Sequence, residues 1–360
     1  MFYNSHINLR LQEFTNRVIR LIAYPLLIVS FTLFGTSVYA KKPNVNTEIG
    51  DTIISGYIQM QFQATSEDDE VPNNTFRVRR GRLKLESKLT ESLLTTFEIN
   101  AATDGVTAKD VYLRYKISPA FSIRVGQIKK SFSFTQLQAP RKSPMIERPL
   151  YVRKKFECYL GRDIGLMVDW EPLKRLELNA GVYNGTDSDL GLIKDNNNAK
   201  DFAGRAELSL VKGLKIAFNA SSHGLSGEDS DSNSIISRRV NAYGADISLQ
   251  RSGFQIVGES MFGDRPKIGD AQMVGYSITM THKHELSALG LIGIKYSEYG
   301  GRAEYMDGDS TDDNDAVTAI TPYIGFYFHS NARLQFCPII QFPQEDETIL
   351  EFTMQAQIEF

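Results

Sequence analysis

The residues of this chain whose types and spacing could do chemistry are the cations between Lys129 and Arg162. This stretch holds nine lysines and arginines against two carboxylates, a net charge of +7, while the whole chain has a formal net charge of −3. Arginine binds oxyanions through paired hydrogen bonds, and lysine presents a compact point charge. In a narrow passage of low dielectric such cations concentrate anions and exclude cations. The alternative is that they are solvated, or bind lipopolysaccharide phosphates outside.

Further cations fall on predicted strands, where alternation places them on the polar face. The acidic residues concentrate elsewhere, in predicted loops at 67–70, 307–315 and 345–347. Together the strands and the basic stretch provide the candidate anion pathway: Arg80, Arg82, Lys84, Arg114, Lys116, Arg124, Lys130, Arg141, Lys142, Arg148, Arg153, Lys154, Lys155 and Arg162.

No enzyme active site is evident. The histidines beyond residue 40, His223, His282, His284 and His329, all fall in predicted loops or turns. The spacing of His282 and His284 could hold a metal, but such pairs in polar turns are more often solvated. A membrane-embedded hydrolase would need a Ser–His pair on an outward-facing strand, and no predicted strand offers a histidine there. We therefore expect no enzyme, no cofactor and no metal site.

The two cysteines leave one question open. Cys158 lies in the basic stretch, and Cys337 lies on the polar face of a predicted strand. A disulfide between them could tether the stretch to the strand in an oxidising compartment. Because sequence gives no distance between the two sulfur atoms, separate thiols remain the alternative.

The elements that must position these residues are β-strands. The last eleven residues, 350–360, alternate strictly between apolar and polar side chains, which is the period of an extended strand. From Thr52 onward the chain repeats about ten alternating residues and a turn. Sixteen segments are predicted, near 52–64, 76–89, 92–102, 109–117, 121–130, 162–170, 176–183, 202–210, 214–221, 237–250, 253–262, 272–281, 288–299, 317–328, 333–342 and 348–360.

The connections between these segments alternate in length. Even-numbered segments lead into short turns, such as 171–175 and 211–213, whereas odd-numbered ones lead mostly into longer polar loops. An even number of amphipathic strands joined in this way is typical of an outer-membrane barrel. The fold class is therefore all-β, a transmembrane antiparallel β-barrel of about 16 strands, and a soluble sandwich or solenoid is the alternative. A polar interior at this strand number predicts an aqueous pore.

One segment, 76–89, breaks the alternation. Phe76 and Val78 are apolar at even positions, whereas the later leucines are apolar at odd positions. A β-bulge near Gly81 would reset the phase and turn Arg80, Arg82 and Lys84 to the lumen. Arg77 and Arg79 are left undecided between the lumen and the membrane interface.

The longest connection, 131–161, holds three prolines and several aromatic side chains that a solvated outer loop does not need. Long ordered loops are usually functional. We expect this segment to fold into the barrel as a basic constriction loop.

Both termini predict export. Three arginines precede the apolar run 21–34, and Val38-Tyr39-Ala40 suits signal peptidase. We therefore expect a cleaved signal peptide at 1–40, with an N-terminal membrane anchor as the alternative, then a periplasmic segment at 41–51 and the pore domain at 52–360. The terminal Phe360 resembles the ending that the outer-membrane assembly machinery reads.

Several motifs resemble a known family. They are Thr75-Phe-Arg-Val-Arg-Arg-Gly-Arg-Leu-Lys-Leu85, Lys109-Asp-Val-Tyr-Leu-Arg-Tyr115, Val125-Gly-Gln-Ile-Lys-Lys-Ser-Phe-Ser133, Met145-Ile-Glu-Arg-Pro-Leu150 and Leu160-Gly-Arg-Asp-Ile-Gly165. In this order they are similar to the phosphate-selective porins O and P, densely over 52–185. The resemblance implies a sixteen-stranded, usually trimeric barrel with a basic path for phosphate or polyphosphate. The chain departs at Lys130-Ser131, where the family has an acidic residue and then proline.

Taken together, the observations predict a passive diffusion channel of the bacterial outer membrane that prefers anions such as phosphate. Expected partners are small anions, outer-membrane lipid and lipopolysaccharide, the assembly machinery and two further copies of the chain, and no nucleic acid. The alternatives are a non-selective general porin, or a structural or receptor barrel whose acidic outer loops bind partners.

Overall fold

The computed structural model describes residues 44–47, 50–67, 73–186, 195, 198–228, 235–266, 271–286, 293–312 and 314–360. The chain divides into two units, 1–41 and 42–360, and the strands described here belong to the second. The expected signal peptide, 1–40, lies outside the described residues. Within the described part, no helix is both long and apolar enough to cross a membrane.

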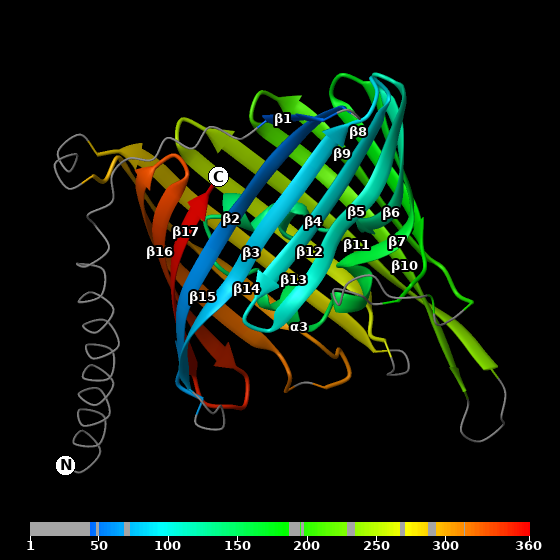
Figure 1. Cartoon of the computed structure of the whole chain (residues 1–360). Coiled ribbons are helices and arrows are strands. Elements are labelled where there is room, and N and C mark those ends of the chain that lie inside the picture. The colour runs from blue at the N-terminus through cyan, green and yellow to red at the C-terminus, as the bar shows by residue number, and fades with distance from the viewer. Residues whose placement is uncertain are drawn as a thin grey trace, which may run out of the picture. The chain divides into compact units, whose positions relative to one another are not determined.

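Sixteen antiparallel strands, β2 to β17, form a closed ring in which β17 pairs with β2 (Figure 1). Each expected strand overlaps one strand of this ring, in one case by only four residues. The strands are β2 (Gly50–Thr65), β3 (Asn74–Lys88), β4 (Leu93–Ala102), β5 (Gly105–Ser118), β6 (Phe121–Lys129), β7 (Arg162–Leu173), β8 (Leu176–Tyr183), β9 (Asp201–Val211), β10 (Leu214–Glu228), β11 (Ile235–Arg251), β12 (Phe254–Asp264), β13 (Gln272–Glu285), β14 (Tyr296–Asp307), β15 (Val317–His329), β16 (Ala332–Pro343) and β17 (Ile349–Glu359).

A short additional strand, β1 (Asn44–Thr47), pairs with the first residues of β2. Part of the segment expected at 41–51 therefore belongs to the sheet. Short turns such as 174–175 and 212–213 join strands at the end of the ring where β17 finishes, and most of the longer connections lie at the other end. Two connections depart from this alternation. The turn-end connection 286–295 is long, and the loop-end connection 103–104 is short.

The two faces of the barrel have opposite chemistry. Leu113, Tyr115 and Ile117 of β5 point outward and are 52%, 54% and 56% exposed. On the inner face, Gln59 and Gln61 of β2 are buried and donate to Gln357 and Gln355 of β17 at 2.7 and 2.8 Å. An apolar exterior around a polar interior suits a barrel surrounded by lipid. Alternation along β2 and β5 therefore separates an outward apolar side from an inward polar side.

The bulge expected near Gly81 lies two residues earlier. Gln59 of β2 pairs with Arg80 and the next residue, Met60, pairs with Val78, so Arg79 is the extra residue. A bulge bends a strand and shifts its alternation by one residue. Arg77, Arg79 and Arg80 consequently all reach the inside of the barrel, which resolves the orientation that the sequence left undecided.

The histidine prediction was wrong. His223 lies in β10, His329 in β15, and His282 and His284 in β13. The imidazole of His282 stacks on the ring of the exposed Phe254 with 4.1 Å between centroids. Strands of the barrel therefore do carry histidine. The neighbouring His284 Nδ1 lies 3.3 Å from the Ser297 hydroxyl. Polar and aromatic residues are tolerated where a barrel strand leaves the apolar band.

Candidate functional site

The connection 130–161 folds against the inner wall through four short helices: α2 (Phe134–Leu137), η1 (Pro140–Lys142), α3 (Leu150–Lys154) and η2 (Glu157–Tyr159) (Figure 1). We call residues 130–161 the inner loop. Its buried aromatic residues pack on small and flexible side chains of the wall, including Ala242, Met273 and Ala319. This hydrophobic cluster explains why the segment is apolar, since burial of those side chains stabilises its position inside the barrel.

Polar contacts fix the same part of the inner loop. The backbone N–H of Leu150 donates to Glu304 at 2.6 Å, and the Tyr151 hydroxyl lies 2.9 Å from that of Ser277. Tyr159 donates to the backbone carbonyl of Asp264 at 2.7 Å. Buried polar groups are costly unless they are hydrogen-bonded, so these contacts specify one position for α3 and η2.

The wall also donates to backbone carbonyls of the inner loop. Arg302 of β14 donates to Glu147 at 2.9 Å, Arg333 of β16 donates to Arg141 at 2.9 Å, and Gln335 donates to Pro144 at 2.7 Å. Arg302 and Arg333 were not among the predicted site residues. They orient the loop backbone. Sequence patterns could not reveal this role, because each partner lies more than 150 residues away in sequence.

The side chain of Glu147 extends from the inner loop toward β3. Arg302, which binds the backbone of the same residue, lies on β14, and the strands β15, β16, β17 and β2 separate β14 from β3 in the ring. Arg79 Nε lies 3.3 Å from Glu147 Oε1, and Arg77 Nη2 lies 3.8 Å from the same oxygen. Burial would raise the pKa of this carboxyl, but the guanidinium groups of Arg79, Arg80 and Arg153 hold it down at about 2. Glu147 is therefore ionised at neutral pH and joins two parts of the wall.

Further cations lie on the inner loop and on strands β3, β6 and β7. Lys129 Nζ and Arg148 Nη2 both donate to the carbonyl of Gln136, at 3.0 and 3.3 Å. Arg162 binds Asp110 at 2.7 Å, and Arg82 pairs with Glu98. The charges of Arg162, Arg148 and Arg82 are all close enough to act on Lys129. We call this set the basic belt: Arg77, Arg79, Arg80, Arg82, Lys129, Arg148 and Arg162.

Three carboxylates, Glu98, Asp110 and Glu147, lie among the seven cations of the basic belt. Four of the predicted site residues belong to it: Arg80, Arg82, Arg148 and Arg162. The sequence prediction left Arg77 and Arg79 undecided and counted Lys129 in the basic stretch without assigning it to the pathway. The alternation of β6 did not reveal Lys129, because its odd-numbered position is in phase with the outward-facing Val125.

Most of the remaining predicted cations contact residues outside the belt. The charge of Arg153, however, acts on Glu147, and its ion pair with Glu351 is 4.0 Å long. Arg114 and Arg124 both bind Asp169, Arg141 binds Glu359 at 2.8 Å, and Lys155 binds Asp315 at 3.3 Å. Lys84 pairs with Glu86 at 2.8 Å. Three further lysines are the exposed Lys116, Lys142 and Lys154.

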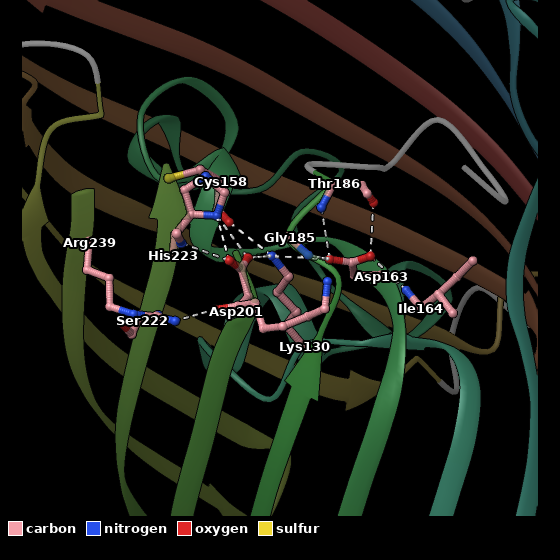
Figure 2. A network of polar contacts seen from close by, with 12 residues as sticks. Lys130, Cys158, Asp163, Ile164, Gly185, Thr186, Asp201, Ser222, His223 and Arg239 are labelled. Carbon is pink, nitrogen blue, oxygen red and sulfur yellow. Dashed lines mark hydrogen bonds and ion pairs between the residues drawn. The ribbon is translucent and has the colours of Figure 1, made fainter. Parts of the chain in front are cut away.

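The structure places Lys130 in a buried network instead of on an open surface, as Figure 2 shows. Its ammonium lies 2.6 Å from Asp201 and 3.9 Å from Asp163, and it donates to the carbonyl of Cys158 at 3.1 Å. His223 Nδ1 lies 2.9 Å from both oxygens of Asp201. Lys130 therefore connects both ends of the inner loop to β7 and β9. Lys130 thus has a structural role.

The two cysteines are not joined by a disulfide. Cys158 belongs to the cluster formed by the inner loop with β10 to β16, whereas Cys337 packs against Met145, Ile146 and Tyr323 in a second cluster. The pairing that the sequence left open is not formed because the two thiols lie in different clusters. Within the described residues, no group of three or more His, Cys, Asp or Glu side chains could hold a metal ion.

A cavity of about 330 Å³ lies between the start of the inner loop and strands β5 to β9. Its charged lining has both signs: Asp110, Glu177, Glu207, Arg124, Lys129 and Arg205. Arg205, which the sequence prediction missed, binds Asp246 and faces inward. The alternation of β9 could have revealed it, since Phe202 and Leu208 on the opposite face are exposed. Lys129 lines the cavity and also belongs to the basic belt.

Comparisons with known proteins agree with this architecture. The family model described as phosphate-selective porin O and P matches residues 54–248. No curated protein sequence matches the chain. Among solved structures, the trimer form of OmpT from Vibrio cholerae has a TM-score of 0.59 at 12% identity, covering 87% of this chain and 100% of that one.

Two other solved structures have a similar fold. An anion-selective porin from Comamonas acidovorans has a TM-score of 0.61 at 10% identity, covering 86% of this chain and 99% of that one. The outer-membrane channel DcaP of Acinetobacter baumannii has a TM-score of 0.62 at 10% identity, covering 88% of this chain and 99% of that one. At these identities the likeness establishes the barrel fold alone.

Proposed function

The chain belongs to the phosphate-selective porin O and P family, and we propose that this outer-membrane porin is a passive diffusion channel that prefers anions such as phosphate or polyphosphate. Porins of this family are channels and not enzymes. The observation that carries the proposal is the convergence of Arg77 and Arg79 of β3 on the inner loop at Glu147. Cations gathered where the lumen is narrowed raise the local concentration of anions.

The pathway that we propose has the basic belt at its centre, together with Arg153. Lys84, Arg114, Lys116 and Arg124 continue it toward the turn end of the barrel, because they lie on the halves of β3, β5 and β6 that are nearest the turns. Arg141, Lys142, Lys154 and Lys155 extend it along the inner loop. Several weak contacts in sequence let an anion enter and leave, since one very tight site would hold it.

We further propose that the protein assembles as a homotrimer. The trimer form of OmpT, which shares the barrel fold, supports this proposal. Small anions are the solutes, and the exposed apolar surface of strands such as β5 faces outer-membrane lipid.

A planar-bilayer measurement under a salt gradient tests the anion preference. We expect the wild-type reversal potential to indicate anion selectivity, and the double substitution Arg79→Gln/Arg148→Gln to lower the anion-to-cation permeability ratio by about tenfold, the lower range for charge focusing. The matched control, Lys174→Gln/Lys212→Gln, removes two exposed charges from turns outside the lumen and should leave the ratio unchanged.

Other outcomes would identify the alternatives. A large conductance without ion preference in the wild-type protein would indicate a general porin. Absence of any conductance would favour a structural or receptor barrel. An equal loss of selectivity in the control variant would show that net charge, and not the basic belt, determines the preference.

A further inference from the structure

Glu147 differs from the other paired carboxylates of the lumen because its ion pairs are long and involve more than one arginine. Arg79 approaches it with two nitrogens, at 3.3 Å to Oε1 and 3.5 Å to Oε2, and Arg77 lies at 3.8 Å. Charge-assisted N–H···O contacts are normally about 2.7–2.9 Å. The Arg162–Asp110 and Lys130–Asp201 pairs, at 2.7 and 2.6 Å, have that normal length.

The long contacts mean that Glu147 is attracted by several charges without being tightly bound to one. It is only 7% exposed, yet its pKa near 2 keeps it ionised over the whole neutral and mildly acidic range, because Arg79, Arg80 and Arg153 outweigh the effect of burial. A carboxylate of this kind lowers the repulsion among neighbouring guanidinium groups. It thereby allows cations of β3 to remain close together when no solute is present.

Arg153 adds a second observation. Its Nε and Nη2 are buried and have no hydrogen-bond partner within the described residues, and its only described ion pair, with Glu351, is 4.0 Å long. Buried donors without acceptors are rare and need an explanation. The charge of Arg153 also acts on Glu147. Arg153 thus has donors without a described acceptor and a charge that acts on the carboxylate of Glu147.

We propose that Glu147 is a resident anion: its carboxylate occupies the place where Arg77 and Arg79 bind a permeating oxyanion, and the solute displaces it. This inference rests on the proposed function and adds how the site releases its solute. A tetrahedral oxyanion offers more acceptors than a carboxylate, so it can bind Arg77, Arg79 and Arg153 together while Glu147 moves aside. Return of the tethered carboxylate then promotes departure of the solute.

The test measures block of a chloride current by inorganic phosphate in planar bilayers, using the full-length assembled protein. Because Glu147→Gln removes the competing charge and keeps the side-chain size, we expect the half-blocking phosphate concentration to fall by about tenfold, which corresponds to about 1.4 kcal/mol. Glu147→Asp keeps the charge but shortens the reach, so its half-blocking concentration should lie between the other two.

The matched control is Glu157→Gln, which removes the other carboxylate of the inner loop; Glu157 is exposed, and phosphate block should stay at the wild-type value. Unchanged or weaker block in Glu147→Gln would overturn the inference. So would Glu147→Asp behaving like the wild type, since net charge alone would then explain the effect. The wild-type reversal potential tests the proposed function separately, because phosphate block can be compared between variants even in an unselective pore.

Discussion

Substitution of Lys130 by methionine is expected to destabilise the barrel by about 3–5 kcal/mol, the range for breaking a buried ion pair by removing one partner. The methionine would leave Asp201 and Asp163 without their cation in a place where Asp201 is 1% exposed and Asp163 is 0% exposed. The carbonyl of Cys158 would lose its donor as well. Urea unfolding of the purified protein in detergent measures this loss.

The control and a second variant separate the ion pair from loss of charge alone. Lys174→Met removes an exposed lysine from a turn and should change the unfolding free energy by less than about 0.5 kcal/mol. The double substitution Lys130→Met/Asp201→Asn also removes the uncompensated carboxylate, while the amide oxygen of the introduced asparagine can still accept from the Gly224 N–H. We expect the double variant to be more stable than Lys130→Met. Strictly additive losses would contradict a coupled pair.

Loss of Lys130 should also affect the inner loop more than the wall. The cation holds both the start of the loop and the carbonyl of Cys158 near its end, as Figure 2 shows. Limited proteolysis of Lys130→Met should therefore cut within 131–161 while the strands remain intact. Cleavage spread over the whole barrel would indicate a general folding defect.

The sixteen strands could be predicted because alternation depends on local sequence. Each strand shows its two faces directly through its apolar and polar residues, as β5 does with Leu113 and Arg114. The largest error in the strand predictions shows where alternation fails as a guide. The segment 288–299 was predicted as a strand, whereas the strand is β14, Tyr296–Asp307.

β14 was hidden because its composition is that of a loop. It contains two adjacent glycines and three acidic residues, which disfavour a strand by propensity. Inside the barrel the acidic side chains have partners. Glu304 binds Arg302 at 2.9 Å, and Glu298 accepts from Tyr323 at 3.2 Å. Tertiary contacts thus offset the weak local preference.

The roles of individual cations could not be predicted for a related reason. The sequence identified an excess of positive charge at 129–162, but the partners lie far along the chain, with Arg79 68 residues from Glu147 and Lys130 71 residues from Asp201. In the sequence, Lys130 and Arg148 are both simply cations of the same basic stretch. Only the closed ring shows that Lys130 is buried with carboxylates, whereas Arg148 lies in the basic belt.

Substitution of Gly275 by alanine is expected to push the inner loop away from the wall into the lumen and so to lower the single-channel conductance. Gly275 lies on the inner face of β13, and a Cβ added there would lie 2.3 Å from Cγ and 2.4 Å from Cβ of Tyr151. These atoms are close to the backbone of α3 and cannot move alone, so α3 must shift. Overpacking of this kind costs about 1–3 kcal/mol. Conductance in planar bilayers and protease sensitivity at 131–161 measure the shift.

Tyr151 provides the decisive comparison for this contact. Tyr151→Ala removes the ring that Gly275 accommodates, and we expect it to loosen the loop by itself, because the tyrosine is fully buried and its hydroxyl contacts Ser277 and Glu259. In that background Gly275→Ala should change the conductance little. Gly258→Ala is the matched control on neighbouring β12, since its Cβ would meet only a methyl group of Ile247 at 3.2 Å. If Gly275→Ala had the same effect with and without the Tyr151 ring, steric contact with the loop could not be its cause, and the glycine would act on the strand alone.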